Sequence, residues 1–247
     1  MYNACKGDFM KKIKKYYIYI FLIIFVIALI TAVIVVYNNH KSDTDFSNIN
    51  LKNTEKVMIV AHPDDEILWG GAHLLEDNYL VVCVTCKEDS KRAAEFTKAM
   101  KATNDKFLML GYPDKTNGER DNWQLHKQKI SNDLQKIIEL KDWHVIVTHN
   151  PEGEYGHIHH KLLNEIVTDV SKTKGNLYYF GRYYTKKTII NHYNELSPIN
   201  DTYSNRKKQI IGMYKSQSFI QTMFDHMFEY EEWIPYNEWS EQSEQTN

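Results

Sequence analysis

The sequence has little cysteine and almost no net charge. Its 247 residues include 30 Lys and Arg against 32 Asp and Glu, a formal net charge of -2, with no large acidic or basic block. Nucleic-acid binding usually demands a clustered basic surface, so the composition argues against a nucleic-acid partner. A hydrophobic content of 43% with five Trp is typical of an ordered globular domain rather than a disordered chain.

Only three cysteines are present, and two of them are close together. Cys83 and Cys86 form a C-x-x-C pair, which is the spacing of a redox centre or of half a zinc site. They lie in an apolar run, residues 80–86, that predicts a buried strand with alternate side chains on opposite faces. Because no second C-x-x-C pair exists, we interpret both as small core residues and not as redox or metal ligands.

One apolar run is long enough to cross a membrane. Residues 16–37 contain no charged side chain, and at about 1.5 Å rise per residue they span a hydrocarbon core of roughly 30 Å. Tyrosines stand at both ends, where amphipathic rings prefer the membrane interface. A cleaved signal peptide would have a shorter apolar core followed by small residues, and no A-x-A pattern follows here. We therefore predict a retained transmembrane anchor.

The charges beside this run predict its orientation. Five lysines precede it, whereas only Lys41 and then Asp43 and Asp45 follow closely. The positive-inside rule places residues 1–15 in the cytoplasm and the rest of a single-pass protein across the membrane. Residues 38–53 are polar and predict a linker, and residues 54–247 have the length of one extracytoplasmic domain.

Strand and helix patterns alternate along this domain. Helical spacing of apolar residues recurs around residues 130–138 and 162–170, and Ser90 can cap a helix running through Met100. Apolar runs predict strands at residues 56–61, 79–86, 107–110, 143–148 and 177–180. The alternation predicts an α/β, Rossmann-like fold, with a mainly parallel sheet covered by helices on both faces. Ligands of such sheets bind beyond the carboxyl ends of the strands.

The first candidate motif directly follows the first predicted strand. It reads Ala-His-Pro-Asp-Asp-Glu over residues 61–66 and packs one imidazole and three carboxylates into five residues. Such a cluster is costly to bury unless a cation or hydrogen bonds compensate it. A nitrogen ligand beside oxygen ligands suits Zn²⁺ better than Mg²⁺ or Ca²⁺, which prefer oxygen shells.

The second candidate motif follows the strand predicted to end at Thr148. Residues 149–160 read His-Asn-Pro-Glu-Gly-Glu-Tyr-Gly-His-Ile-His-His, a Gly- and Pro-containing loop that leads into a helix. His157 and His160 are three residues apart and would share a face on the first turn of that helix, while His159 would point elsewhere. Both motifs lie at predicted strand ends of one sheet, so together they predict a three-ligand metal site with an open position.

These residues resemble a known family. The Ala-His-Pro-Asp-Asp-Glu segment and the later H-x-x-H are similar to the hallmarks of the LmbE-like, or PIG-L, de-N-acetylases. The resemblance covers residues 56–170 and includes Arg92 with Glu95 and the segments 110–114 and 148–151, with a further family-like segment at residues 214–217. The second motif departs from the commoner H-P-D-H by carrying Ile158 and His159 between the two outer histidines.

The resemblance implies a role for each matching residue. His62, Asp65 and His160 would ligate Zn²⁺, Asp64 would be the general base, and His157 would stabilise the oxyanion or protonate the leaving amine. Glu66 would support the site from the start of a helix. Arg92 would contact substrate or pair with a helix neighbour, Glu88 or Glu95. The implied reaction is hydrolytic removal of acetyl from an N-acetylated amino sugar in a glycoconjugate, glycolipid or polysaccharide.

Two other functions remain open at this point. In a glycosyltransferase, adjacent Asp residues would hold a divalent metal on a nucleotide diphosphate, but the histidines would then be idle. A non-catalytic carbohydrate-binding surface domain would carry only remnants of the site, whereas the two motifs here are complete. Zinc content together with acetate release would distinguish the deacetylase from both.

Overall fold

The computed structural model describes residues 2–40, 46–171 and 175–239. The chain separates into two compact units, residues 1–43 and residues 44–247. The first unit is the helix α1 (Tyr2–His40), which contains an apolar segment, Lys14–Ile34, with mean hydropathy 3.0. By length and composition this segment fits a membrane span or a signal sequence.

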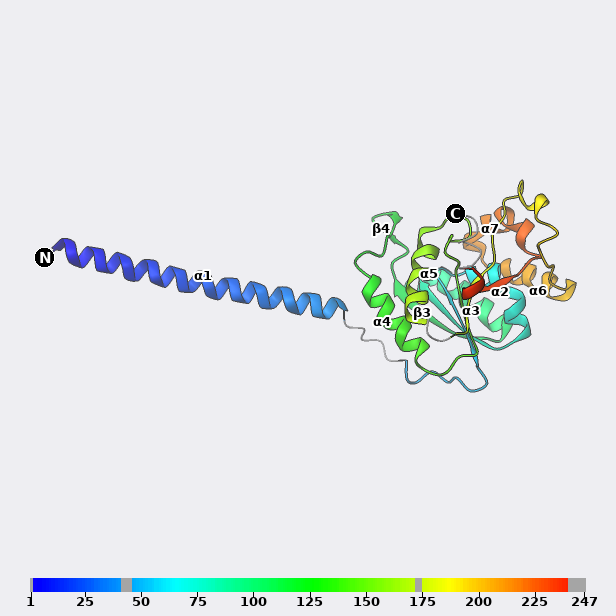
Figure 1. Ribbon diagram of the computed structural model, residues 1–247, viewed down its shortest axis with the longest axis horizontal. Helices are drawn as coiled ribbons and strands as arrows, with labels where there is room; N and C mark the ends of the chain where they lie inside the picture. Colours follow the sequence, from blue (N-terminus) through cyan, green and yellow to red (C-terminus); the bar gives the residue numbers. More distant parts are fainter. Residues whose placement is uncertain (1, 41–45, 172–174, 240–247) are drawn as a thin grey trace. The chain divides into compact units, whose positions relative to one another are not determined.

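The second unit is built on a six-stranded sheet with the order β3-β2-β1-β6-β7-β8 (Figure 1). All neighbouring pairs run parallel except β7 and β8, so the predicted mainly parallel sheet is confirmed. The order reverses between β1 and β6, as in doubly wound folds. The strands are β1 (Lys56–Val60), β2 (Tyr79–Thr85), β3 (Lys106–Tyr112), β6 (Val145–Thr148), β7 (Leu177–Phe180) and β8 (Trp233–Pro235).

Helices cover both faces of this sheet. All seven residues of β2 are buried, because alternate side chains face the two helical layers. One layer is formed by α4 (Lys127–Ile138) and α5 (Ile158–Ser171). The other is formed by α2 (Asp65–Glu76), α3 (Ser90–Thr103) and α6 (Asp201–Ile211), as Figure 1 shows. The prediction of helices on both faces is thus confirmed.

Two local details differ from the prediction. Asp89, and not Ser90, caps α3, because its carboxylate accepts from the backbone N–H groups of Lys91 and Arg92, each at 3.1 Å. Cys83 is buried as predicted, but Cys86 lies beyond the end of β2 with φ 64° and only partial burial. Its Sγ lies 3.3 Å from Arg92 Nη1, so Cys86 belongs to the edge of a polar cluster and not to the core.

Part of the predicted linker, residues 46–53, packs on the domain. Phe46 is only 4% exposed and packs in the core cluster, with Ile49 and Leu51 partly buried against the same cluster. Residues 46–53 therefore lie on the domain, because their apolar side chains have a surface to bury against. Residues 38–40 continue α1, and residues 41–45 lie outside the described residues.

The segment after β7 contains a buried ion pair, and one of its two residues also bonds to α2. Lys207 Nζ lies 2.7 Å from Glu231 Oε1, and both side chains are fully buried. Glu231 also accepts from the backbone N–H of Ala72 at 2.8 Å, which ties the approach to β8 to the middle of α2. This segment contains the short α7 (Phe219–Met223) and 3-10 turns at Ile189–Asn191, Lys215–Gln217 and Asp225–Met227. A two-stranded hairpin, β4 (Lys115–Thr116) and β5 (Glu119–Arg120), follows β3.

Candidate active site

The two predicted motifs meet at the point where the strand order reverses. Strands β1 and β6 are parallel neighbours, with Ile59 opposite Thr148, so the chain segments that follow them leave the same edge of the sheet. The backbone N–H of Ala61 donates to His149 Nε2 at 3.0 Å, which links the first motif directly to the second. This edge is the usual ligand-binding position in doubly wound sheets.

The first motif forms a tight turn into α2. The backbone N–H of His62 donates to Asp65 Oδ2 at 2.8 Å, and His62 Nδ1 lies 3.2 Å from the same oxygen. Asp64 precedes the helix with φ 116°, a conformation that non-glycine residues rarely adopt. Its backbone N–H donates to Glu66 Oε2 at 3.0 Å. The turn therefore aims the Asp64 and Asp65 carboxylates in different directions.

The second motif brings its two outer histidines to the same place. Helix α5 begins at Ile158, so His157 lies just before the first turn and not on it as predicted. The His157 and His160 ring centroids are nevertheless 4.5 Å apart. His62, His157 and His160 each offer a ligand atom, and these atoms lie within 4.8 Å of one another.

His160 is fully buried between two carboxylates. Its Nδ1 lies 2.6 Å from Glu154 Oε2, and its Nε2 lies 3.3 Å from Asp65 Oδ2. Glu154 Oε2 also lies 3.0 Å from His149 Nδ1, and the His149 ring stacks on that of His160 at 3.8 Å. The sequence analysis assigned no role to His149 or Glu154. Glu154 could have been singled out from the sequence, because it is a carboxylate between the two glycines of the loop that leads to the histidines.

His159 lies outside the group that His157 and His160 form with His62, but it contacts the first motif at the other ring nitrogen of His62. Its Nδ1 lies 3.0 Å from His62 Nε2, and its ring stacks on Trp123 with centroids 4.1 Å apart. Asp114 Oδ1 lies 3.3 Å from the same His62 nitrogen. The side chain of His159 reaches this point because α5 begins beside His62, so successive residues at its start flank the first motif.

Arg92 contacts neither of the helix neighbours expected for an ion pair. Its Nη2 lies 3.0 Å from the Pro63 carbonyl and 3.4 Å from Asp64 Oδ2, and its Nη1 lies 3.5 Å from Asp114 Oδ2. Arg120, from the β4–β5 hairpin, also pairs with Asp114. Arg92 therefore holds the Asp64 turn from one side.

The family-like segment at residues 214–217 completes the site. Tyr214 is fully buried, and its hydroxyl donates to Glu66 Oε1. Ser216 donates from its backbone N–H to Glu95 at 2.9 Å, which explains why Glu95 does not pair with Arg92. Glu66 thus lies behind Asp64 and holds the first motif to the C-terminal segment.

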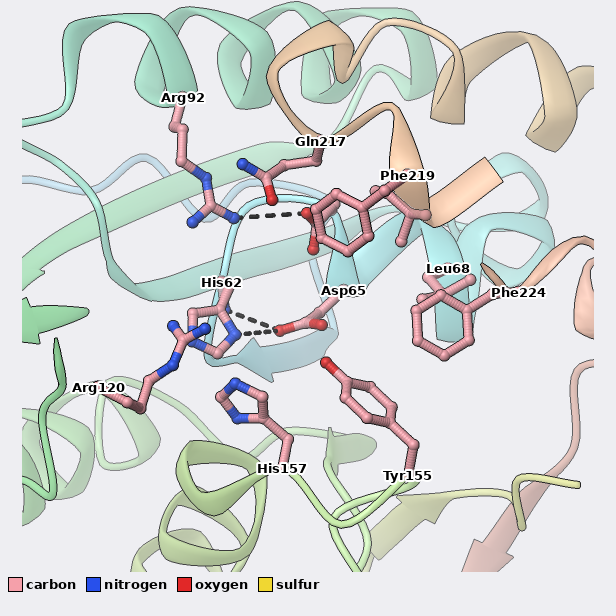
Figure 2. A pocket seen from close by; sticks show the side chains of 12 residues that line it. His62, Asp65, Leu68, Arg92, Arg120, Tyr155, His157, Gln217, Phe219 and Phe224 are labelled. Atoms are coloured by element: carbon pink, nitrogen blue, oxygen red, sulfur yellow. Dashed lines mark hydrogen bonds and ion pairs between the residues drawn. The ribbon is translucent and has the colours of Figure 1, made fainter. Parts of the chain in front are cut away.

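An open pocket lies over these groups. His62, Asp64, Asp65, Arg92, Arg120, His157 and Gln217 form its polar lining, and Leu68, Tyr155, Phe219, Ile220 and Phe224 form its apolar lining. Figure 2 shows His62 and Asp65 at the centre, with Arg92 and Gln217 on one side and His157 and Tyr155 on the other. The pocket therefore presents the Asp64 and Asp65 carboxylates and two histidines to a ligand beside an apolar wall.

Burial and mutual repulsion shift the ionisation of the acidic groups. Burial, with the neighbouring Asp65, raises the pKa of Asp64 well above its usual range. Burial also raises the pKa of Glu66 to about 8, although Tyr214 opposes this shift. Against the cost of burial, the charge of His160 and the close ring nitrogens of His149, His160 and His62 hold the pKa of Asp65 well below its usual range. The first motif therefore holds two carboxyl groups that resist ionisation beside one that ionises readily.

The histidines differ sharply from one another. Burial and the neighbouring His62 lower the pKa of His157 to about 2, so this imidazole is neutral at neutral pH. Although burial opposes the charge, Asp65 and Glu154 raise the pKa of His160 to about 10. Asp65, which favours a proton on His160 Nε2, would also favour a metal cation at that nitrogen.

The residues present fit a Zn²⁺ ion. His160 Nε2 is buried and has no hydrogen-bond partner among the described residues, so it is free to bind a ligand. Asp65 Oδ2 lies 3.2 Å from His62 Nδ1 and 3.3 Å from His160 Nε2. Ligands about 2 Å from a tetrahedral ion are separated by about 3.3 Å, so each of these two distances matches that between neighbouring ligands of such an ion. A second set of atoms within 4.8 Å of one another, on Asp65, His149 and His160, shares two of these residues.

Comparisons with solved structures show the fold. The A40926 pseudoaglycone deacetylase Dbv21 is 17% identical, with a TM-score of 0.54 over 69% of this chain and 85% of that one. The N,N'-diacetylchitobiose deacetylase of Pyrococcus horikoshii is 15% identical, with a TM-score of 0.51 over 72% and 77%. The hydratase GalB of Pseudomonas putida is 12% identical, with a TM-score of 0.51 over 70% and 84%. The same fold therefore serves more than one reaction.

Sequence comparisons show the family. An uncharacterized protein of Acanthamoeba polyphaga mimivirus, L374, is 30% identical over 178 residues, which cover 65% of this chain and 76% of the viral protein. Residues 57–171 match the PIG-L family, described as GlcNAc-PI de-N-acetylase. This match spans both motifs and the strands that position them. The chain therefore belongs to the PIG-L, or LmbE-like, family.

Proposed function

We propose that this protein is a zinc-dependent hydrolase that removes the acetyl group from an N-acetylated amino sugar. The observation that supports it most directly is the position of Asp65 Oδ2 between His62 Nδ1 and His160 Nε2, at the floor of an open pocket. These three residues would hold the ion. When bound, Zn²⁺ supplies Lewis acidity toward the amide carbonyl and toward water.

Asp64 is the proposed general base. It lines the pocket, its turn is held by Arg92, and it lies beside the ligand Asp65 without sharing the contacts of Asp65 to the histidines. Its raised pKa brings the carboxylate closer to the range in which a base accepts a proton from water and later releases it.

His157 is the proposed donor to the developing oxyanion. The backbone N–H of His159 donates to His157 Nδ1 at 3.2 Å, so the single ring proton of the neutral imidazole lies on Nε2. A neutral imidazole with a fixed N–H is a directed hydrogen-bond donor beside the reacting amide. The same nitrogen can pass its proton to the leaving amine.

The acetylated-sugar substrate rests on the family and on the site together. The family description names GlcNAc-PI as the compound that is de-N-acetylated, and two of the structural neighbours are named as deacetylases of the A40926 pseudoaglycone and of N,N'-diacetylchitobiose. Since the hydratase GalB shares the fold, the fold alone does not select the reaction. The choice of hydrolysis rests on the ligand set, Asp64 and His157.

We also propose that residues 16–37 remain as a membrane anchor and that the catalytic domain is extracytoplasmic. The apolar segment of α1 has the length of a span, and lysines are concentrated before it. The enzyme would then act on substrates at the outer side of the membrane.

The test uses the full chain purified in detergent. Elemental analysis should find one zinc per chain, and acetate should be released from a panel of N-acetylglucosamine conjugates. His160→Ala should lose most of the metal and the activity, whereas His144→Ala, which removes an exposed histidine, should retain both. Mn²⁺-dependent cleavage of a nucleotide sugar would instead indicate a glycosyltransferase, and binding of sugar without metal or acetate release would indicate a carbohydrate-binding domain.

A further inference from the structure

The two ring nitrogens of His62 face different partners. Nδ1 lies 3.2 Å from the Asp65 carboxylate, and Nε2 lies 3.0 Å from His159 Nδ1 and 3.3 Å from Asp114 Oδ1. A histidine that binds a metal through one nitrogen carries its proton on the other and requires an acceptor for it. The environment of Nε2 therefore decides how firmly His62 is held as a ligand.

His159 is fixed as an acceptor at this position. Its Nε2 lies 2.5 Å from the carbonyl oxygen of Asp121, and because a carbonyl can only accept, that nitrogen carries the proton. Its Nδ1 consequently presents a lone pair to His62 Nε2. The His159 side chain is fully buried and its ring is stacked on Trp123 at an interplanar angle of 8°, so its orientation is constrained from the side as well.

Asp114 is the competing acceptor, but its carboxylate has other partners. Arg92 lies 3.5 Å from Oδ2, and Arg120 pairs with Oδ1, the same oxygen that faces His62. The separation between Asp114 Oδ1 and His62 Nε2, 3.3 Å, is also longer than the 3.0 Å to His159. The better-placed acceptor for the His62 proton is thus an uncharged imidazole.

We propose that His159 is a positioning residue that acts through His62. Two hydrogen bonds in series join the Asp121 carbonyl to His159 and His159 to His62. They fix the tautomer and ring rotation of His62, so that Nδ1 faces Asp65. The inference rests on the proposed function, because it takes His62 as a metal ligand. His159 is not among the residues that line the pocket, so its effect is on metal affinity and not on substrate contact.

Two amide substitutions separate the two nitrogens of His159. In His159→Asn the side-chain oxygen can take the place of Nδ1 and still accept from His62. In His159→Gln the amide reaches the place of Nε2 and can still donate to the Asp121 carbonyl, but the acceptor for His62 is lost. Zinc dissociation constants are measured by chelator competition on the full chain in detergent. We expect His159→Asn to stay within about threefold of the native chain and His159→Gln to bind roughly 10- to 100-fold more weakly.

The control pair is His144→Asn and His144→Gln, at an exposed histidine, and neither should change the dissociation constant. If His159→Gln binds zinc as tightly as the native chain, or His159→Asn loses as much affinity as His159→Gln, the proposed role of His159 is overturned. If Asp114→Asn alone weakens binding, the operative acceptor is Asp114. A native chain that binds no zinc overturns the proposed function as well, which distinguishes the two failures.

Discussion

Glu154 Oε2 lies 2.6 Å from His160 Nδ1 and also 3.0 Å from His149 Nδ1, with all three side chains fully buried. One carboxylate oxygen therefore receives N–H groups from two stacked imidazoles. His149 Nε2 therefore presents a lone pair, and His160 Nε2 would present one to a bound metal. The lone pair of His149 accepts from the Ala61 backbone, and His160 Nε2 faces Asp65. Glu154 thus holds the ring of the proposed ligand His160 in a fixed position relative to His149, at the start of the second motif.

Replacing Glu154 by Gln should weaken metal binding. An amide can accept both N–H groups only through its oxygen, and its NH₂ then faces Asn150 N–H, from which Glu154 Oε1 now accepts at 2.9 Å. We expect a roughly 10- to 100-fold loss of zinc affinity, measured by chelator competition. Glu152→Gln, two residues earlier and exposed, is the matched control and should have no effect. Unchanged affinity in Glu154→Gln would show that the bond to His160 is not needed.

Asp64 and Asp65 should give different kinds of defect although they are adjacent. Asp64→Asn keeps the side-chain shape but cannot accept a proton, so it should retain zinc and substrate affinity and lose about 10²- to 10⁴-fold in kcat. Asp65→Asn should instead weaken zinc retention, and excess Zn²⁺ should partly restore its activity. Metal content and steady-state kinetics of both variants provide the measurement.

The opposite pattern would reverse these assignments. If Asp64→Asn lost its metal while Asp65→Asn remained fully metallated and inactive, Asp64 would be the ligand and Asp65 the base. The contacts argue for the first arrangement, because Asp65 Oδ2 faces His62 and His160 while Asp64 Oδ2 faces Arg92.

Protease added to intact cells should digest the catalytic domain. The excess of lysines before the apolar segment of α1 predicts that the domain is extracytoplasmic. Immunodetection of a C-terminal epitope before and after permeabilisation measures the exposure. A cytoplasmic marker protein must remain intact in the same sample. Complete protection of the domain until permeabilisation would contradict the orientation, and recovery of a shortened soluble form would indicate cleavage after the apolar segment.

Asp105 should make the stability of the domain depend on pH. Its side chain accepts from the Tyr79 N–H at 2.7 Å, and burial raises the pKa of Asp105 to about 7. An unfolded Asp has a pKa near 3.9, so the folded state binds more protons between about pH 4 and pH 7. The contribution of this carboxyl is therefore favourable below about pH 4 and is lost as the pH rises to about 7.

Asp105→Asn should remove this dependence, because the amide keeps an acceptor for Tyr79 and does not ionise. We expect the variant to be more stable than the native chain at pH 7.5, by roughly 1 to 3 kcal/mol, and the difference to shrink toward pH 4. Thermal unfolding across this pH range measures it, with the exposed Asp142→Asn as control. A difference that did not change with pH would rule out titration of Asp105 as the cause.

The positions of the main strands along the chain were predictable from local patterns. Runs such as residues 79–85 are buried on both faces of the sheet, so their hydrophobicity alone identifies them as interior strands. β8, by contrast, is only three residues long and pairs antiparallel with β7. So short a segment has no periodicity to detect, and the buried pair of Lys207 with Glu231, which lies just before β8, joins residues too far apart in the sequence to form a local pattern.

The helix start at residues 89–90 shows the limit of a local rule. Asp89 and Ser90 are both good capping residues, and either side chain can accept from the first N–H groups of a helix. The backbone path from the end of β2 decided between them, since the chain reaches Asp89 in an extended conformation, φ -80° and ψ 97°. The same path gives Cys86 a positive φ and turns it toward Arg92.

For the candidate site, the sequence by itself determined which residues follow β1 and β6, because both motifs are contiguous and parallel strands end at the same edge. Only the tertiary structure decided that Glu154, His159, Asp114 and Tyr214 join them. Each of these contacts spans a loop or connects separate elements, with Tyr214 lying 148 residues from Glu66. Side chains brought together in this way leave no regular spacing in the sequence, since their proximity is set by how the helices pack on the sheet.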